Sequence, residues 1–165
     1  MQTSKLLQGK GVNFLIIGNG HIEDEIRTLI QTADLSNVEW LSNNLPLKEL
    51  ADRMRECHIS LGQFEKHERL ERTIPHKAFE SLVMGLPYVT GRAGGVAELL
   101  TDGKDCLMVD CGDPEDLAAK ILRLKNSPEL VSTIGNNGRK LFENKLTASK
   151  LAGDIIRTLD TYPRL

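Results

Sequence analysis

The sequence predicts an α/β fold, Rossmann-like, in which a mostly parallel sheet is flanked by helices. Short apolar runs alternate with amphipathic helical patterns, which is the order expected when parallel strands are joined by crossover helices. Glycine-containing turns follow several apolar runs, at the places where strands would pass into helices. No linker rich in Pro, Gly or Ser divides residues 1–165, so we expect a single domain.

The first half of the chain is predicted to contain three strands and two helices. Apolar runs predict buried strands at residues 12–17, 38–41 and 58–61. The pattern predicts an amphipathic helix at residues 23–33. Four apolar side chains at its start and along its length are expected to face inward: Ile22, Ile26, Leu29 and Ile30. Pro46 suits the start of a second helix, residues 46–56, where its missing N–H is not needed. In that helix Leu50 and Met54 are expected to face inward.

Residues 72–95 predict a loop, a helix, a tight turn, a buried strand and a glycine loop in succession. Pro75 suits a first helical turn, and Gly85 suits the left-handed residue that ends a helix. Between them, four apolar residues fall on one helical stripe: Ala78, Phe79, Leu82 and Val83. Two more strands (88–90 and 107–109) and three closing helices (114–124, 128–142 and 147–159) complete the prediction.

Composition excludes several classes of function. A chain of 165 residues with 40% hydrophobic and 27% charged residues has the composition of an ordinary single soluble domain. A net charge of −2 and a pI of about 6.1 give no electrostatic case for binding nucleic acid or an anionic membrane. No apolar run approaches a membrane span, and no signal peptide is visible. The three cysteines and four histidines lack metal-ligand spacing, so we expect no metal site and reduced thiols in a cytoplasmic protein.

The start of the helix near Pro75 is the main candidate for a ligand site. Lys77 and Glu80 share a face beside a helix N-terminus, where free N–H groups and the helix dipole attract phosphate. The candidate residues in this turn are Thr73, Ile74, Pro75, His76 and Lys77. Each of four side chains has a purely structural role as the alternative: Thr73 as an N-cap, His76 as a capping or surface residue, and Lys77 and Glu80 on a solvated face.

Two glycine pairs are further candidates. Gly18 and Gly20 follow a strand and precede a helix, but the dinucleotide fingerprint fails because its third glycine would be Glu23. They line a nucleotide cleft or form a tight turn. Gly94 and Gly95 present backbone amides to a phosphate or sugar. Alternatively, they begin a helix, and the Glu98 carboxylate interacts favourably with the dipole of that helix.

These patterns together resemble the donor-binding, C-terminal domain of the GT-B retaining glycosyltransferases of the family 4 type. The resemblance rests on the order of five segments: 79–89 (Phe-Glu-Ser-Leu-Val-Met-Gly-Leu-Pro-Tyr-Val), 94–99 (Gly-Gly-Val-Ala-Glu-Leu), 102–103 (Asp-Gly), 107–109 (Leu-Met-Val) and 112–118 (Gly-Asp-Pro-Glu-Asp-Leu-Ala). It extends from Phe14 to Leu159. In that family the second Glu of an E-x7-E motif contacts the nucleotide ribose, a role that the resemblance carries to Glu80.

The chain departs from the family pattern in two places. The first Glu of E-x7-E would fall at Arg72, with Glu71 one residue out of register, so the sugar-contact role is not assigned. Ile74 to Lys77 instead resemble a variant loop, Ile-Pro-x-Lys. The chain also begins inside the helix that follows the family's first strand and basic loop. We therefore expect a fragment without that strand and without the acceptor-binding N-terminal domain, or a chain in which something else replaces the strand.

The resemblance implies a donor domain that serves in glycan or cell-surface polysaccharide synthesis. The complete enzyme would transfer a sugar from a UDP- or GDP-sugar, without a metal or other cofactor, to a glycan or lipid-linked acceptor. Its catalytic residues are not identified, and its partners would be an acceptor-binding domain or separate chain, with peripheral membrane association of the full enzyme. The isolated chain is expected to be inactive. Two alternatives are a non-catalytic nucleotide-binding subunit and an α/β interaction domain that needs a partner chain.

Overall fold

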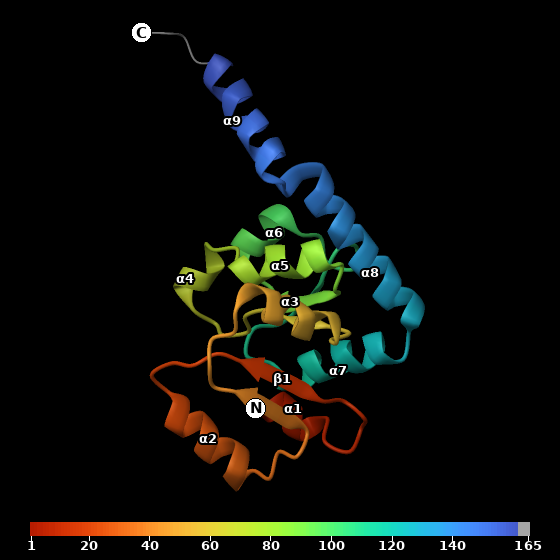
Figure 1. Cartoon of the computed structure of the whole chain (residues 1–165). Helices are drawn as coiled ribbons and strands as arrows, with labels where there is room; N and C mark the ends of the chain where they lie inside the picture. The colour runs from red at the N-terminus through yellow and green to blue at the C-terminus, as the bar shows by residue number, and fades with distance from the viewer. Residues whose placement is uncertain (162–165) are drawn as a thin grey trace.

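The computed structural model describes residues 1–161 and has five strands in two parallel sheets, enclosed by helices (Figure 1). The smaller sheet pairs β1 (Phe14–Ile17) with β2 (Val38–Leu41). The larger has the order β3-β4-β5, formed by Ser60–Leu61, Tyr88–Gly91 and Leu107–Val109. All five predicted strands are therefore present, but hydrogen bonding divides them between two sheets where we expected one.

Helices connect the strands in the predicted order. Before the larger sheet, the chain forms α1 (Gln2–Leu6), α2 (Glu23–Thr32) and α3 (Leu47–Arg55). Around its strands are α4 (Glu68–Glu71), α5 (His76–Met84) and α6 (Gly94–Leu99). The chain then continues through α7 (Pro114–Lys125), α8 (Pro128–Leu141), a π-helical turn η1 (Phe142–Leu146) and α9 (Ala148–Thr161). The π-helical turn is an element that the periodicity did not predict.

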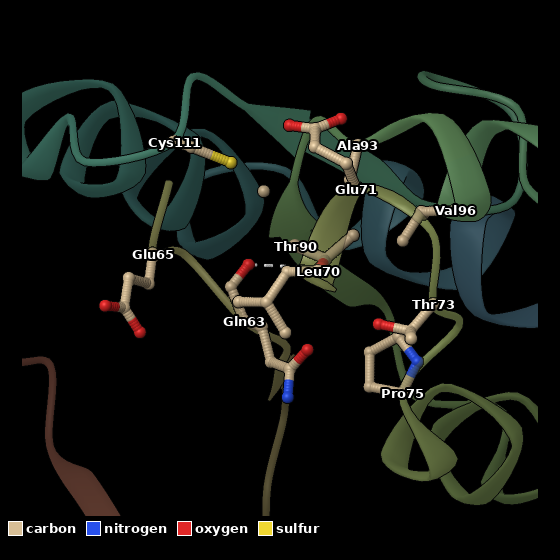
Figure 2. Close-up of a pocket in the computed structure, with 11 residues that line it drawn as sticks. Gln63, Glu65, Leu70, Glu71, Thr73, Pro75, Thr90, Ala93, Val96 and Cys111 are labelled. Atoms are coloured by element: carbon tan, nitrogen blue, oxygen red, sulfur yellow. Dashed lines mark hydrogen bonds between the residues drawn. The ribbon is translucent and has the colours of Figure 1, made fainter. Parts of the chain in front are cut away.

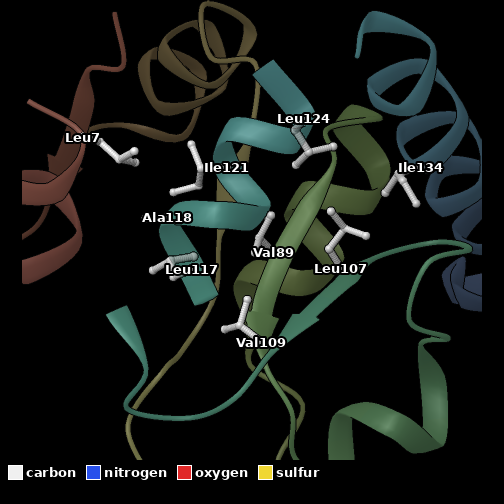
Figure 3. Packing of buried hydrophobic residues seen from close by; sticks show 9 residues of the cluster. All are labelled: Leu7, Val89, Leu107, Val109, Leu117, Ala118, Ile121, Leu124 and Ile134. Atoms are coloured by element: carbon white, nitrogen blue, oxygen red, sulfur yellow. The ribbon is translucent and has the colours of Figure 1, made fainter. Parts of the chain in front are cut away.

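The core lies on both faces of the larger sheet. Because successive strand residues point to opposite faces, Val89 of β4 packs into one cluster and its neighbour Tyr88 into the other. Figure 3 shows the first cluster, in which β4 and β5 meet α1, α7 and α8: Leu7, Val89, Leu107, Val109, Leu117, Ala118, Ile121, Leu124 and Ile134. The second cluster joins α5 and α6 to the opposite face, through Ala78, Leu82, Tyr88, Ala93, Val96, Leu100, Cys106 and Met108.

Three expectations about inward faces are wrong. Ile22 and Leu29, expected to face inward, are 54% and 44% exposed, and no residue of α2 is buried. Val83 of α5 is also exposed, at 43%. Residues 147–159 do not close the fold: α9 extends away from the body beyond α8 (Figure 1), and its apolar side chains Leu151, Ile155, Ile156 and Leu159 are exposed. Within residues 1–161, no helix combines the length and apolar character needed to cross a membrane.

Candidate functional site

The turn of residues 73–77 lies at the beginning of α5, at the end of the larger sheet where its strands finish. Pro75 is the N-cap, with φ −65° and ψ 141°, so it lies one residue before the helix and not in its first turn. Thr73 lies two residues further back and is not the cap. The amide of Ala78 donates to the Pro75 carbonyl at 2.9 Å, which leaves the earlier amides of His76 and Lys77 at the start of the helix.

Glu80 lies one turn into the same helix. Its Oε1 is 3.2 Å from Nδ1 of His76, and the Glu80 side chain is 39% exposed while that of His76 is 89% exposed. The contact is an i,i+4 pair, which on a solvated helix face contributes a few tenths of a kcal/mol. The carboxylate is thus held by a weak contact and is open to a ligand that approaches the turn.

Gly95 packs directly against the turn. A Cβ at this position would lie 2.8 Å from the Thr73 amide nitrogen and 2.9 Å from the Arg72 carbonyl carbon, so only glycine allows this approach. Gly94 is exposed and begins α6. The structure therefore brings together two segments that the sequence singled out separately, the turn 73–77 and the Gly94-Gly95 pair.

A small hollow, with room for about one water molecule, lies beside this turn (Figure 2). Of the candidate residues, Thr73 and Pro75 line it. The other lining residues come from the end of β4, from the loops after β3, β4 and β5, and from helices α4 and α6: Gln63, Glu65, Leu70, Glu71, Thr90, Gly91, Ala93, Val96 and Cys111. The Thr90 hydroxyl donates to the Gln63 carbonyl at 3.5 Å inside the hollow.

Glu71 is the acidic residue that the sequence left unassigned. Its Oε2 accepts a hydrogen bond from the Gly94 amide at 3.2 Å, whereas Arg72 turns outward to pair with Glu68 at 3.3 Å. The carboxylate at the start of α6 is therefore that of Glu71. Glu98 lies in the last turn of α6, so the expectation that it favours the helix N-terminus is wrong. Gln63, Glu65 and Glu71 belong to a run of mixed charge, residues 63–72, that follows β3. Such a run after the C-terminal end of a strand is the sequence signal that could have identified them, because ligands bind at these loops in α/β sheets.

Gly18 and Gly20 lie elsewhere, at the end of β1 in the two-stranded sheet. A Cβ built at either meets no atom within 4 Å, and neither glycine lines the hollow. Gly18 has φ 133°, which favours glycine, and its carbonyl accepts a hydrogen bond from the Trp40 indole at 3.0 Å. The conformation of Gly18 is therefore that of the tight-turn alternative.

The remaining chemistry of the hollow is mild. Burial, followed by the nearby carboxylates of Glu71 and Asp110, raises the pKa of Cys111, so this side chain is a neutral thiol at neutral pH. Among residues 1–161, no group of three His, Cys, Asp or Glu side chains could hold a metal ion. The groups that could meet a ligand are backbone amides, hydroxyls, carboxylates and the exposed Lys77.

Residues 2–141 match the family model of the glycosyl transferases group 1. The chain belongs to this family. An uncharacterized glycosyltransferase of Methanocaldococcus jannaschii is 31% identical over 138 residues, which is 84% of this chain and 37% of that protein. The capsular polysaccharide biosynthesis glycosyltransferase CapM of Staphylococcus aureus is 25% identical over 166 residues, 98% of this chain and 42% of the relative. The chain thus spans about two-fifths of the length of these relatives.

Solved glycosyltransferases share the fold. HepE of Anabaena, solved in complex with UDP, has a TM-score of 0.81 at 20% identity, and the match covers 98% of this chain and 44% of HepE. Sucrose-phosphate synthase from Thermosynechococcus elongatus has a TM-score of 0.78 at 19% identity, over 95% of this chain and 41% of the synthase. The parallel sheets flanked by helices are therefore those of a GT-B glycosyltransferase domain, as the resemblance implied.

Proposed function

We propose that this chain is the nucleotide-sugar donor domain of a retaining glycosyltransferase in glycan or cell-surface polysaccharide synthesis. The observation that carries the proposal is the contact of Gly95 with the turn 73–77, beside the open carboxylate of Glu80. Membership of the group 1 family supports it, as do the relatives named for polysaccharide synthesis. The donor is a UDP- or GDP-sugar, and no bound metal or cofactor is required.

The diphosphate of the donor binds at the turn. The first amides of α5 and the positive end of its dipole attract an anion, and Lys77 adds a cation that binds phosphate as a point charge. Thr73, Ile74, Pro75 and His76 supply the backbone of this cradle. Gly94 and Gly95 form the other wall of this cradle, because the lack of a side chain at Gly95 lets the start of α6 approach Thr73 closely.

The nucleoside half lies along α5 towards Glu80. A carboxylate that accepts hydrogen bonds from ribose hydroxyls contributes on the order of 1.5–3 kcal/mol. We extend the proposal to Gly18 and Gly20, which follow β1 in the smaller sheet and lie outside the hollow, because ligands of doubly wound folds bind beyond the carboxyl ends of the strands. They complete the donor site from that side.

The test is titration calorimetry with UDP and with GDP. We expect Glu80→Ala to weaken nucleotide binding about tenfold or more, because the ribose contact is lost. The matched control is Glu143→Ala, since Glu143 is likewise a half-exposed glutamate in an i,i+4 pair, with Arg139 at 2.9 Å. Equal affinities in wild type and Glu80→Ala would remove Glu80 from the site. Absence of binding by wild type to either nucleotide would contradict the proposed function itself.

A further inference from the structure

Helix α6, which begins with Gly94 and Gly95, is too short to hold its own position. A helix of six residues contains few internal hydrogen bonds and depends on tertiary contacts for its stability. The chain leaves the larger sheet at Arg92, whose amide donates to the Val109 carbonyl at 2.8 Å, and it re-enters the sheet in β5. The whole of α6 lies in the excursion between these two points. Contacts around the excursion therefore decide where the two glycines lie.

The side chain of Arg92 closes this excursion across its base. Its Nη2 donates to Oδ2 of Asp102 at 2.8 Å, and Asp102 lies just after the end of α6. The same guanidinium approaches β5 and the loop after it, since Nη1 lies 3.9 Å from Sδ of Met108 and Nε lies 3.9 Å from Oδ1 of Asp110. One side chain thus connects the residue before the α6 N-cap to the segment after α6 and to the sheet.

Asp102 is itself held in place, so it is a fixed partner for the guanidinium. Its Oδ1 accepts a hydrogen bond from the Met108 amide at 2.9 Å, and its backbone forms a β-bridge with Cys106. Burial opposes the charge of this carboxyl group, but the Met108 amide, Arg92 and Lys120 together lower its pKa below the usual value. The carboxylate is therefore charged at neutral pH and joins the start of α6 to β5.

The position of α6 matters at the candidate site because its backbone touches the turn 73–77. A Cβ at Gly95 would lie 2.8 Å from the Thr73 amide nitrogen, which leaves no room for α6 to move closer. Val96 and Leu100 anchor the helix in the core, where both side chains are almost fully buried. Rotation of α6 about these two buried side chains would still carry the glycines away from the turn. The ion pair of Arg92 and Asp102 opposes such a rotation.

We propose that Arg92 is a positioning residue for the donor, and that its ion pair with Asp102 holds Gly94 and Gly95 against the turn 73–77. The inference rests on the proposed donor function. Arg92 does not line the hollow, and its guanidinium is already engaged by Asp102 and Met108, so it acts through the segment that it closes. Since the glycines face the diphosphate and sugar of the donor, loss of the pair weakens binding of that half of the ligand and spares the nucleoside.

The first test is amide hydrogen exchange on residues 1–165 without nucleotide. The amides of Ala97 and Leu100 report on α6, because they donate to the carbonyls of Ala93 and Val96 at 3.0 and 2.9 Å. Arg92→Gln should speed the exchange of both amides by about three- to fivefold, as expected for loss of a partly exposed ion pair. The amides of α5 should keep their wild-type rates.

Three further variants show whether the ion pair itself is responsible. Asp102→Asn should match Arg92→Gln, because it removes the charge and keeps an oxygen that can accept from the Met108 amide. Arg92→Lys should restore much of the protection, since a lysine keeps the charge. The matched control is Arg157→Gln, which breaks the ion pair with Asp154 on α9. Wild-type exchange of α6 in both Arg92→Gln and Asp102→Asn would overturn the proposal, and so would equal acceleration in the control.

The second test compares a nucleoside diphosphate with its monophosphate, by NMR-detected titration with UDP, UMP, GDP and GMP. Arg92→Gln and Asp102→Asn should each weaken binding of UDP or GDP about threefold or more, with little change for the monophosphate. A loss in Arg92→Gln that is absent from Asp102→Asn would mean that Arg92 touches the phosphate directly, which refutes a positioning role. Equal losses for diphosphate and monophosphate would indicate a general defect and would refute it as well.

The two tests separate this inference from the proposed function. Absence of wild-type binding to all four nucleotides would contradict the donor function, and with it the role of Arg92 in donor binding. The exchange rates of α6 would still decide whether the ion pair holds the helix. Normal nucleotide binding by wild type, Arg92→Gln and Asp102→Asn alike would leave the donor function intact and overturn the inference alone.

Discussion

At the scale of single residues, Tyr88 shows how burial controls ionisation. It is fully buried on β4, and its hydroxyl has no hydrogen bond of good geometry within residues 1–161, although the nearby Thr90 hydroxyl partly favours the ionised form. Burial is the largest cause that raises the pKa of Tyr88 to about 12, and the nearby Cys106, also buried, has its pKa raised to about 12. Both groups are therefore neutral in the folded protein at ordinary pH.

We predict that Tyr88→Phe reduces the loss of stability in alkali. A folded-state pKa above the unfolded value of 10.0 means that the stabilisation is complete below pH 10.0 and is lost as pH rises through about 12. For a shift of two units, the loss in wild type approaches about 2–3 kcal/mol from this group. Tyr88→Phe lacks the loss of stability that comes from ionisation of Tyr88 and keeps the loss that comes from Cys106.

Urea unfolding at about pH 8 and about pH 11 measures the difference. At the lower pH, Tyr88→Phe should be neutral or stabilising, since it removes a buried hydroxyl without a partner. The same alkaline loss in wild type and variant would show that Tyr88 does not ionise on unfolding in this range.

At the scale of elements, the crossing of α5 and α8 positions the candidate site. Gly85 ends α5 in the left-handed conformation, with φ 70° and ψ 23°, as the sequence predicted. Gly135 of α8 lies against it so closely that a Cβ at Gly135 would overlap the Gly85 carbonyl oxygen. This contact fixes the C-terminal end of the helix whose start carries the turn 73–77.

We predict that Gly135→Ala lowers the free energy of unfolding by about 1–3 kcal/mol, because the added methyl must push two backbones apart. Gly153→Ala is the matched control. Gly153 also lies inside a helix, but its methyl would meet only the Arg157 guanidinium, at 3.6 Å. That substitution should stabilise α9 by up to about 1 kcal/mol, the helix-propensity difference between Gly and Ala. Urea midpoints compare the two, and a neutral Gly135→Ala would show that α5 and α8 can separate at no cost.

At the scale of the whole molecule, the candidate site is an open surface at the strand ends. The hollow between the turn and α6 is small, and Lys77, Gly94 and His76 are exposed around it. Closure over a substrate supplies orientation and excludes water, and both lower the barrier to transfer. An open site of this kind supports binding better than chemistry.

We therefore predict that residues 1–165 alone transfer no sugar. The measurement is incubation with labelled UDP- and GDP-sugars and a panel of glycan and lipid-linked acceptors. Product should stay at the level of the buffer control. Turnover above that level that disappears in Glu80→Ala would contradict the prediction. Turnover that persists in the variant would point to a contaminating enzyme.

The sequence by itself determined the five strands, most of the helices and their order, but not α4 or the π-helical turn. Strands such as residues 38–41 and the C-terminal glycine of α5 follow from local patterns, because a run of apolar residues or a left-handed residue imposes its conformation within a few positions. The family resemblance likewise depended on segments that are contiguous in the chain.

Only the tertiary structure decided which of these elements meet. It divided the strands between two sheets and left α2 and α9 with exposed apolar faces. It placed the carboxylate of Glu71 beside the Gly94 amide, while Arg72 pairs with Glu68. It also separated Gly18 from the hollow and packed Gly95 against Thr73. Such contacts depend on side-chain volume and backbone direction between residues far apart in the chain. Hydrophobic periodicity reports which face of an element is apolar, but not which partner covers it.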